Sequence, residues 1–325
     1  MGKNRLITTW GFSVLLAALW AATPVVAQDR QENCRTAVEC LAQLQFGETA
    51  SDREVAARTL GQREWPEGIP ALVQAMQQDP GEFVRLYAAE ALGFIGDTST
   101  VEPLSQALRE DLRESVRQAA ARSLGLLRTP AAADALILAL ANDPAYSVRI
   151  STALALGQSG ASSGVQPLAT SLANDGRKEV RVMAAQALGL LGTADVGAPL
   201  ITALGSDPEW EVRQMAARSL TQVTGEGTHA ALIQALAGDA HRVVRLEAAQ
   251  VLGARAEIAS AEQLVLTLQT DTDIEVRLAA ARSLGEVQGV LAYRALVYYR
   301  DRSELADIRR VANEVLEDFP PPRGL

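Results

Sequence analysis

Residues 276–285 read VRLAAARSLG, and closely similar phrases stand at 116–125 (VRQAAARSLG) and 180–189 (VRVMAAQALG). The arginine of this phrase returns every 32 residues, with no insertion or deletion. Its nine copies are Arg53, Arg85, Arg117, Arg149, Arg181, Arg213, Arg245, Arg277 and Arg309. A fixed period of this length is typical of stacked repeats, in which each unit contacts only its neighbours. Such a stack presents an extended binding surface rather than one deep pocket.

Each repeat has the pattern of two helices. Over residues 101–108, apolar residues three and four apart indicate an amphipathic helix, and Pro103 is tolerated in its first turn. A polar turn at 110–114 follows, and the phrase itself predicts a second helix over 115–124 that ends at Gly125. The chain is 48% hydrophobic but only 4% aromatic, and its many Ala and Leu residues are strong helix formers. We therefore predict an all-α superhelical solenoid of about nine two-helix repeats.

The second helix of each repeat has buried faces and one free stripe. Val116, Ala120 and Leu124 share one side of the helix at 115–124, and paired alanines allow adjacent helices to approach closely. The stripe left free in this copy consists of Gln118, Ala119 and Arg122. We expect any binding specificity to reside in the variable residues of this stripe.

A series of aspartates accompanies the arginines, each six residues before one of them. Its members are Asp79, Asp111, Asp143, Asp175, Asp207, Asp239 and Asp271. In the turn between the two helices, such a carboxylate can accept hydrogen bonds from N–H groups at the start of the second helix. It can also reach the arginine of its own or the adjacent repeat, so that a charge-assisted ladder runs along the stack. Seven equivalent copies indicate a structural role rather than an active site.

The sequence pattern of the repeat resembles that of a known family. The pattern Asp…Val-Arg-x-x-Ala-Ala-x-x-Leu-Gly, preceded by Pro-Leu-x-x-Ala-Leu at 103–108 and 199–204, is similar to HEAT repeats, in particular the short, regular kind associated with phycobilisome bilin lyases. One extra residue in the inner turn sets this chain apart. The resemblance covers residues 36–318 and implies a right-handed superhelix with the second helices on its concave side. It also implies a scaffold or adaptor more often than an enzyme.

The amino end has the features of a secretory signal peptide. Lys3 and Arg5 precede an apolar run at 10–22, and small residues lead to an expected cleavage between Ala27 and Gln28. An uncleaved membrane anchor is the alternative, although the run is short for a membrane span. We expect a signal peptide at 1–27, a lead-in at 28–35, the solenoid at 36–318 and a proline-rich tail at 319–325. The mature protein is then periplasmic or extracellular, with no stable membrane insertion.

The charge balance bears on possible partners. Loss of residues 1–27 removes two basic residues, which leaves 28 basic against 39 acidic residues. A chain with this excess of negative charge repels phosphate backbones, so nucleic acid is not expected as a partner.

Two cysteines follow the expected cleavage site. Thr36 and Glu39 form the pattern of a capping box, which places Cys40 on the first turn of a helix and Cys34 before it. A chain folded back over this helix start can bring the two sulfurs together, and an exported protein is oxidised. We favour a disulfide between Cys34 and Cys40, with free thiols as the alternative.

The sequence contains few candidate catalytic groups. The chain has two histidines, His229 at the start of a first helix and His241 in an inner turn, and both fit ordinary surface positions. None of the common hydrolase, metalloprotease or phosphate-loop motifs occurs. We therefore predict no metal or cofactor, and no catalytic residues.

The free stripe is the candidate binding surface. It is apolar in the middle repeats, with arginines toward its edges and at one equivalent position in several repeats. The candidates are Arg58, Arg122, Ile150, Leu154, Val182, Met183, Met215, Arg218, Leu246 and Arg282. An apolar centre edged by arginines suits a partner helix or an extended peptide. Alternatively, the apolar members pack between repeats while the arginines pair with nearby carboxylates. Tyr146 and Trp210, equivalent residues of the inner turns, either contact a partner or wedge between repeats.

Two functions follow from this surface. The first is a non-enzymatic scaffold that binds a protein or peptide along the concave face. The second is an enzyme or a lyase-like accessory that holds a small or anionic ligand through the arginine row. The two differ in whether the arginines of the stripe are available to a ligand.

Overall fold

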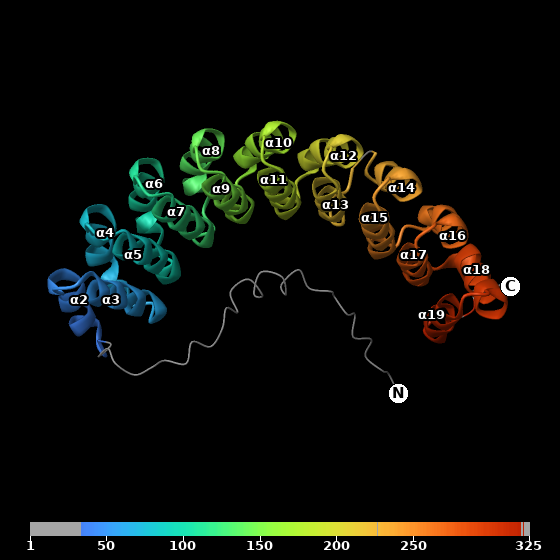
Figure 1. Ribbon diagram of the computed structural model, residues 1–325, viewed down its shortest axis with the longest axis horizontal. Helices are drawn as coiled ribbons and strands as arrows, with labels where there is room; N and C mark the ends of the chain where they lie inside the picture. The colour runs from blue at the N-terminus through green and yellow to red at the C-terminus, as the bar shows by residue number, and fades with distance from the viewer. Residues whose placement is uncertain (1–33, 226, 320, 322–325) are drawn as a thin grey trace. The chain divides into compact units, whose positions relative to one another are not determined.

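The computed structural model describes residues 34–225, 227–319 and 321, and within them every regular element is a helix (Figure 1). The predicted signal peptide, most of the lead-in and most of the tail lie outside these residues. The described helices belong to one compact unit that begins at Cys34. They alternate between an outer layer of first helices and an inner layer of second helices, so the predicted all-α solenoid is confirmed.

The outer layer contains α2 (Ala37–Phe46), α4 (Ile69–Gln78), α6 (Val101–Glu110), α8 (Ala133–Asn142), α10 (Val165–Asn174), α12 (Gly197–Ser206), α14 (Thr228–Gly238), α16 (Ala261–Thr270) and α18 (Gly289–Arg302). The inner layer contains α3 (Ala50–Gln62), α5 (Glu82–Ile95), α7 (Glu114–Leu126), α9 (Tyr146–Ser159), α11 (Lys178–Leu191), α13 (Trp210–Ser219), α15 (Arg242–Arg255), α17 (Ile274–Val287) and α19 (Ala306–Glu317). Single 3-10 turns precede most first helices: η1 (Pro66–Gly68), η2 (Thr98–Thr100), η3 (Pro130–Ala132), η4 (Ser162–Gly164), η5 (Ala194–Val196) and η6 (Ile258–Ser260).

The glycine that closes most copies of the phrase allows inner helices to touch. A Cβ added at Gly157 of α9 would lie 2.8 Å from the Cα of Ala187 in α11, and one at Gly61 would lie 2.6 Å from the Cα of Ala91. Inner helices consequently contact each other more extensively than outer helices do. Close packing on one layer and looser packing on the other curves the stack toward the inner layer (Figure 1).

The prediction that Gly125 ends the second helix is wrong. Helix α7 continues through it to Leu126, and Gly125 is buried against the Cα of Ala155 in the next repeat. The left-handed residue that ends an inner helix comes later, as Gly96 (φ 74°) after α5 and Gly192 (φ 59°) after α11 show. Packing, rather than termination, is therefore what requires glycine in the phrase.

One inner helix is shorter than the others because its glycine is missing. Thr221 occupies the position, and the residue that would face it in α15 is Val251, where most repeats have alanine or serine. Helix α13 ends at Ser219, before the two bulkier side chains would have to meet. Arg255 then donates from Nη1 to the carbonyl oxygens of Leu220 and Val223, at 2.8 and 2.7 Å. This contact replaces hydrogen bonds that a longer helix would have made.

Both ends of the stack are closed by local contacts. Thr36 and Glu39 form the capping box of α2, and a disulfide joins Cys34 to Cys40, whose Cα atoms are 5.0 Å apart. At the other end, Phe319 was expected in the tail but is buried edge-on against Tyr293 of α18. Among the described helices, none is both long and apolar enough to cross a membrane.

Candidate functional site

The repeated arginines and aspartates form a ladder between repeats, named here the Arg–Asp ladder. Arg149 on α9 donates to both carboxylate oxygens of Asp175 in the next repeat, from Nε at 2.8 Å and from Nη2 at 3.0 Å. Its Nη1 donates to the main-chain oxygen of Asp143 in its own repeat, at 2.9 Å. The same bidentate pair joins Arg53–Asp79, Arg85–Asp111, Arg117–Asp143, Arg149–Asp175, Arg181–Asp207, Arg213–Asp239 and Arg245–Asp271.

Each aspartate also closes its own turn. Asp175 Oδ1 accepts a hydrogen bond from the N–H of Arg177, the residue immediately before α11, at 2.9 Å. Burial opposes ionisation of Asp175, but the hydrogen bonds from Arg149 and from the Arg177 N–H outweigh it, so the pKa of Asp175 lies below its usual value. The aspartate therefore remains a carboxylate that ties two repeats together and orders one turn, which is a structural role.

The ladder stops before the last repeat. Arg277 was predicted to belong to it, but Ser303 stands where its aspartate would be. Arg277 instead donates from Nε to the carbonyl oxygen of Leu268, at 2.8 Å. Arg309 likewise donates to the carbonyl oxygen of Ser303.

Most arginines of the predicted binding stripe already contact other residues. Arg122 donates to Glu90 of the preceding repeat at 2.7 Å, and Arg58 lies over the ring of Tyr87, 4.9 Å from its centroid.

Arg218 holds the buried carboxylate of Glu247 through two hydrogen bonds, at 2.8 and 2.6 Å. Arg282 is exposed and has no ion pair with any described residue. The structure therefore does not assemble the four arginines into a free cationic row.

The apolar members of the stripe divide into two groups. Ile150, Val182, Met183, Met215 and Leu246 are half-buried and pack against the core. The half-buried Leu154 is not part of that packed set. Ala119, predicted to be free, is fully buried between inner helices.

Two exposed leucines extend the stripe toward the ends of the inner helices. Leu126 on α7 is 48% exposed and Leu190 on α11 is 38% exposed. Sequence reasoning missed them, although each stands nine residues after a ladder arginine and four residues after a stripe residue. Both lie on helices rather than on loops.

The centre of this surface carries no charge. We define the inner stripe as the residues one, two, five and nine positions after each ladder arginine. In the fourth and fifth repeats these residues are Ile150, Ser151, Leu154, Gln158, Val182, Met183, Gln186 and Leu190, of which Ser151 is buried. Arg122 and Arg218 stand at the two sides of this uncharged segment, each paired with a carboxylate.

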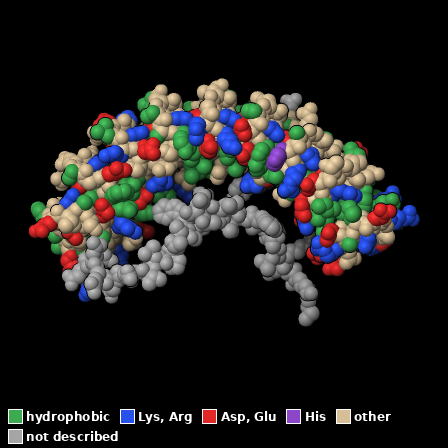
Figure 2. All heavy atoms as spheres, viewed as in Figure 1, with side chains coloured by type: hydrophobic (Ala, Val, Ile, Leu, Met, Phe, Trp, Pro, Cys, Tyr) green, Lys and Arg blue, Asp and Glu red, His purple; other side chains and the backbone are tan. Residues whose placement is uncertain are grey.

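A second series of contacts, the turn-edge pairs, joins the starts of the inner helices. In each pair, the first residue of one inner helix meets the residue just before the next inner helix. Trp210 stacks on His241 with centroids 4.3 Å apart, and Arg177 lies 4.4 Å from the centroid of the Tyr146 ring. The ion pairs of the series are Glu82–Arg113, Lys178–Glu209 and Arg242–Asp273. Side chains of both charges accordingly gather along this face (Figure 2).

Tyr146 and Trp210 each contact a residue of the next repeat through these pairs, while Tyr146 remains 43% exposed, so its contact with a partner stays a prediction. The chemistry of the turn-edge pairs differs from pair to pair, so no single residue type repeats along the sequence. The signal that reveals them is a constant separation of 31 residues between complementary partners, as in Glu82 and Arg113.

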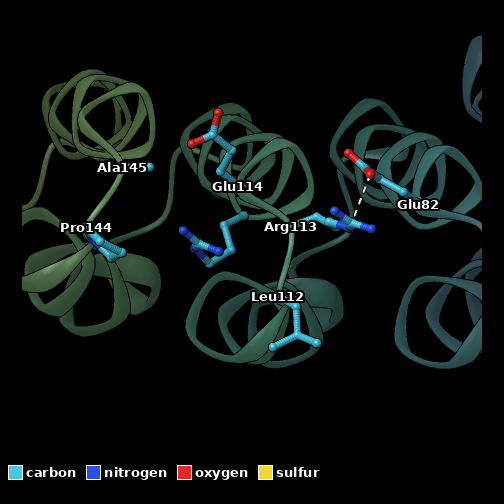
Figure 3. A pocket seen from close by; sticks show the side chains of 7 residues that line it. Glu82, Leu112, Arg113, Glu114, Pro144 and Ala145 are labelled. Carbon is cyan, nitrogen blue, oxygen red and sulfur yellow. Dashed lines mark ion pairs between the residues drawn. The ribbon is translucent and has the colours of Figure 1, made fainter.

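One position that lies between two complete pairs is open. Glu114 begins α7, and the residue opposite it is Ala145, whose side chain cannot form a polar pair. A shallow hollow of about 450 Å³ lies here (Figure 3), lined by Glu82, Leu112, Arg113, Glu114, Arg117, Pro144 and Ala145.

The sequence pattern of HEAT repeats matches residues 38–125, 101–175, 165–253 and 229–317, which together span nearly all the described chain. The protein belongs to the HEAT-repeat family. No curated protein is significantly similar in sequence.

Several solved structures resemble this HEAT-repeat chain. The complex of CpcE and CpcF of phycocyanin lyase from Nostoc matches at 25% identity, with a TM-score of 0.40 and coverage of 91% of this chain and 99% of that chain. Human deoxyhypusine hydroxylase matches at 22% identity and a TM-score of 0.36, over 86% of this chain and 94% of that chain. Importin beta matches at 15% identity and a TM-score of 0.59, over 86% of this chain and 44% of importin beta. The importin beta likeness shows a shared solenoid fold alone.

The two histidines of the HEAT-repeat solenoid do not meet. His229 lies beside Glu257, with Nδ1 and Oε2 2.7 Å apart, whereas His241 belongs to the turn-edge pair with Trp210. Within the described residues, no group of three or more His, Cys, Asp or Glu side chains is arranged to hold a metal ion.

Proposed function

We propose that this HEAT-repeat protein is an exported, non-enzymatic scaffold that binds a partner protein along the inner stripe. The observation that carries the proposal is the uncharged, mostly apolar segment of the fourth and fifth repeats, which lies on the inner helices α9 and α11 between two paired arginines. Covering a surface of this kind with a partner costs little desolvation free energy, because the neighbouring charges already have partners within the chain.

The chemistry of the stripe favours a helix or an extended peptide with one apolar face. Leu154 and Leu190 supply apolar contact area, and the thioether of Met183 adapts to the shape of a bound side chain. Gln158 and Gln186 can donate and accept hydrogen bonds beside them, which suits the main chain of a partner.

Site-specific photo-crosslinking tests this binding surface. A photoreactive amino acid at position 154 or 190 is expected to yield a discrete adduct with one partner in the native cell envelope. The same amino acid at Leu138, which is 55% exposed on the outer helix α8, serves as the matched control and is expected to yield none. Equal adducts at 138 and 154, or none at either stripe position, would contradict the proposal.

Export is supported by the amino-terminal sequence and by the Cys34–Cys40 disulfide, since disulfides persist in oxidising compartments. We expect the mature protein to be recovered from the periplasm or medium with Gln28 as its first residue. Amino-terminal sequencing of the purified native protein measures this directly. A mature chain that still begins at Met1 and sediments with membranes would instead support the anchor.

The alternative of a small anionic ligand held by the arginine row has less support. Arg122 and Arg218 each hold a carboxylate of a neighbouring repeat, so an anion would have to displace Glu90 or Glu247. Nothing in the described part of the chain favours displacement of these carboxylates by an anion. The protein scaffold is therefore the function that we propose.

A further inference from the structure

The series of turn-edge pairs is interrupted at one place. Glu82–Arg113 stands on one side of the interruption, and Tyr146–Arg177 stands on the other. Between them, Glu114 faces Ala145. The carboxylate of Glu114 forms no hydrogen bond or ion pair within 4 Å with any described residue, although its charge helps to raise the pKa of Arg117, whose main partner is Asp143. The interruption therefore combines an exposed carboxylate with the absence of the side chain that would pair with it.

A hollow lies on the surface at this interruption, and apolar residues form part of its border. Figure 3 shows Pro144 and Ala145 on one side of the hollow, and Glu114, Arg113 and Leu112 on the other. Leu112 is 93% exposed, more than any other large hydrophobic residue among those described. An isolated exposed leucine needs no explanation, but one beside a hollow and an unpaired carboxylate marks a place for contact.

The other charges around the hollow are already compensated. Arg113 pairs with Glu82, and Arg117 is held by Asp143 at 2.7 Å. Glu114 acts on Arg117 through its charge but is not in direct contact with a cation, so among the charged groups that line the hollow it is the one with room for a cationic ligand.

We propose that this hollow receives an arginine side chain of a partner protein, with an apolar neighbour of that arginine resting on Leu112. The guanidinium would pair with Glu114 while its aliphatic stem covers Ala145 and Pro144. Both neighbouring pairs already contain an arginine at the position equivalent to Ala145, namely Arg113 and Arg177. A partner would therefore supply in trans the residue that this repeat lacks.

The site lies at the starts of the inner helices, apart from the inner stripe, and it stands whether or not the stripe binds a partner. The peptide N-acetyl-leucyl-arginine amide is a suitable probe, and its neutral analogue has citrulline in place of arginine. Titration of the full chain, followed through the NMR signals of the Glu114 and Ala145 amides, is expected to show saturable shifts at millimolar peptide. Citrulline is expected to weaken the affinity about two- to fivefold, as expected for one exposed ion pair.

Two substitutions test the mechanism from opposite sides. Glu114→Gln removes the attracting charge, and we expect the arginine peptide to bind no better than the citrulline peptide. Ala145→Arg supplies the missing side chain within the chain itself, as Arg113 and Arg177 do next to it, and we expect it to abolish the saturable shifts while raising Tm. Glu275→Gln removes an exposed carboxylate from the first turn of α17 and is the matched control, with unchanged affinity.

The proposal is overturned if the two peptides bind equally to the wild-type chain, if either variant binds the arginine peptide as tightly as wild type does, or if no saturable shift develops at the solubility limit of the peptide. Because the Tm of each variant is recorded alongside, loss of folding is recognised separately from loss of the site. The cross-links expected at positions 154 and 190 do not depend on any of these outcomes.

Discussion

Replacing Asp175 with alanine is expected to lower the free energy of unfolding by about 3–5 kcal/mol. The change leaves the Arg149 guanidinium, whose side chain is only 16% exposed, without its carboxylate between two repeats. It also removes the acceptor for the Arg177 N–H ahead of α11. Urea denaturation followed by circular dichroism measures the loss.

The exposed pair Arg300–Asp301 is the control for this prediction. Both side chains are well solvated, and we expect Asp301→Ala to cost much less stability than Asp175→Ala does. A similar cost for both substitutions would show that the Arg–Asp ladder contributes no more than surface ion pairs do.

The ladder also has a predictable pH dependence. The pKa of Asp175 and that of Asp271 are lowered in the folded chain; burial opposes this, but the arginine and backbone hydrogen bonds outweigh it. Their stabilisation is therefore present above the unfolded-state value of about 3.9 and is lost as the pH falls through the lower folded-state value. We expect stability to decrease below about pH 4, and to decrease less steeply in Asp175→Asn.

Gly157→Val is expected to destabilise the chain by about 1–3 kcal/mol through overpacking. The added Cβ alone would lie 2.8 Å from the Cα of Ala187, and the neighbour is backbone on a buried helix that cannot turn aside. Thermal denaturation monitored by circular dichroism measures the effect.

Gly205→Ala separates this packing effect from helix propensity. Gly205 also lies within a helix, α12, but nothing comes within 4 Å of an added Cβ there. We expect the alanine to stabilise the chain by about 0.5–1 kcal/mol, because glycine is a poorer helix former. If Gly157→Ala stabilised the protein as much as Gly205→Ala does, the close contact between α9 and α11 would not be limiting.

The fold could be predicted because the same 32-residue pattern recurs nine times. An error in assigning the two helices of one repeat would have to be repeated in all nine copies. The structural roles of individual residues in the repeat were harder to predict. Gly125 fits both a helix end and a helix crossing, and the sequence does not distinguish the two, because a crossing depends on which helix lies opposite. Ala119 was similarly misplaced on the free stripe, since an alanine carries no preference for solvent or core.

The candidate sites could be predicted from the sequence only where the same residue type recurs at the same position of each repeat. The aspartates recur as one residue type, so their ladder could be inferred, whereas the turn-edge pairs use a different chemistry at each step and could not. Arg122 was recognised as a stripe residue, but its partner Glu90 lies one repeat earlier and is identified only by its distance. The open position between Glu114 and Ala145 became visible because the neighbouring pairs are complete.

The Arg–Asp ladder has a direction, and this affects how the chain can be made. Every ladder arginine reaches an aspartate that follows it by 26 residues, and none reaches back to the carboxylate of an earlier repeat. A chain that emerges amino end first therefore holds each guanidinium in water until the next turn has been synthesised, and only then docks the new repeat. Assembly of the solenoid can thus follow synthesis one repeat at a time, with one ladder arginine awaiting its aspartate at the growing end.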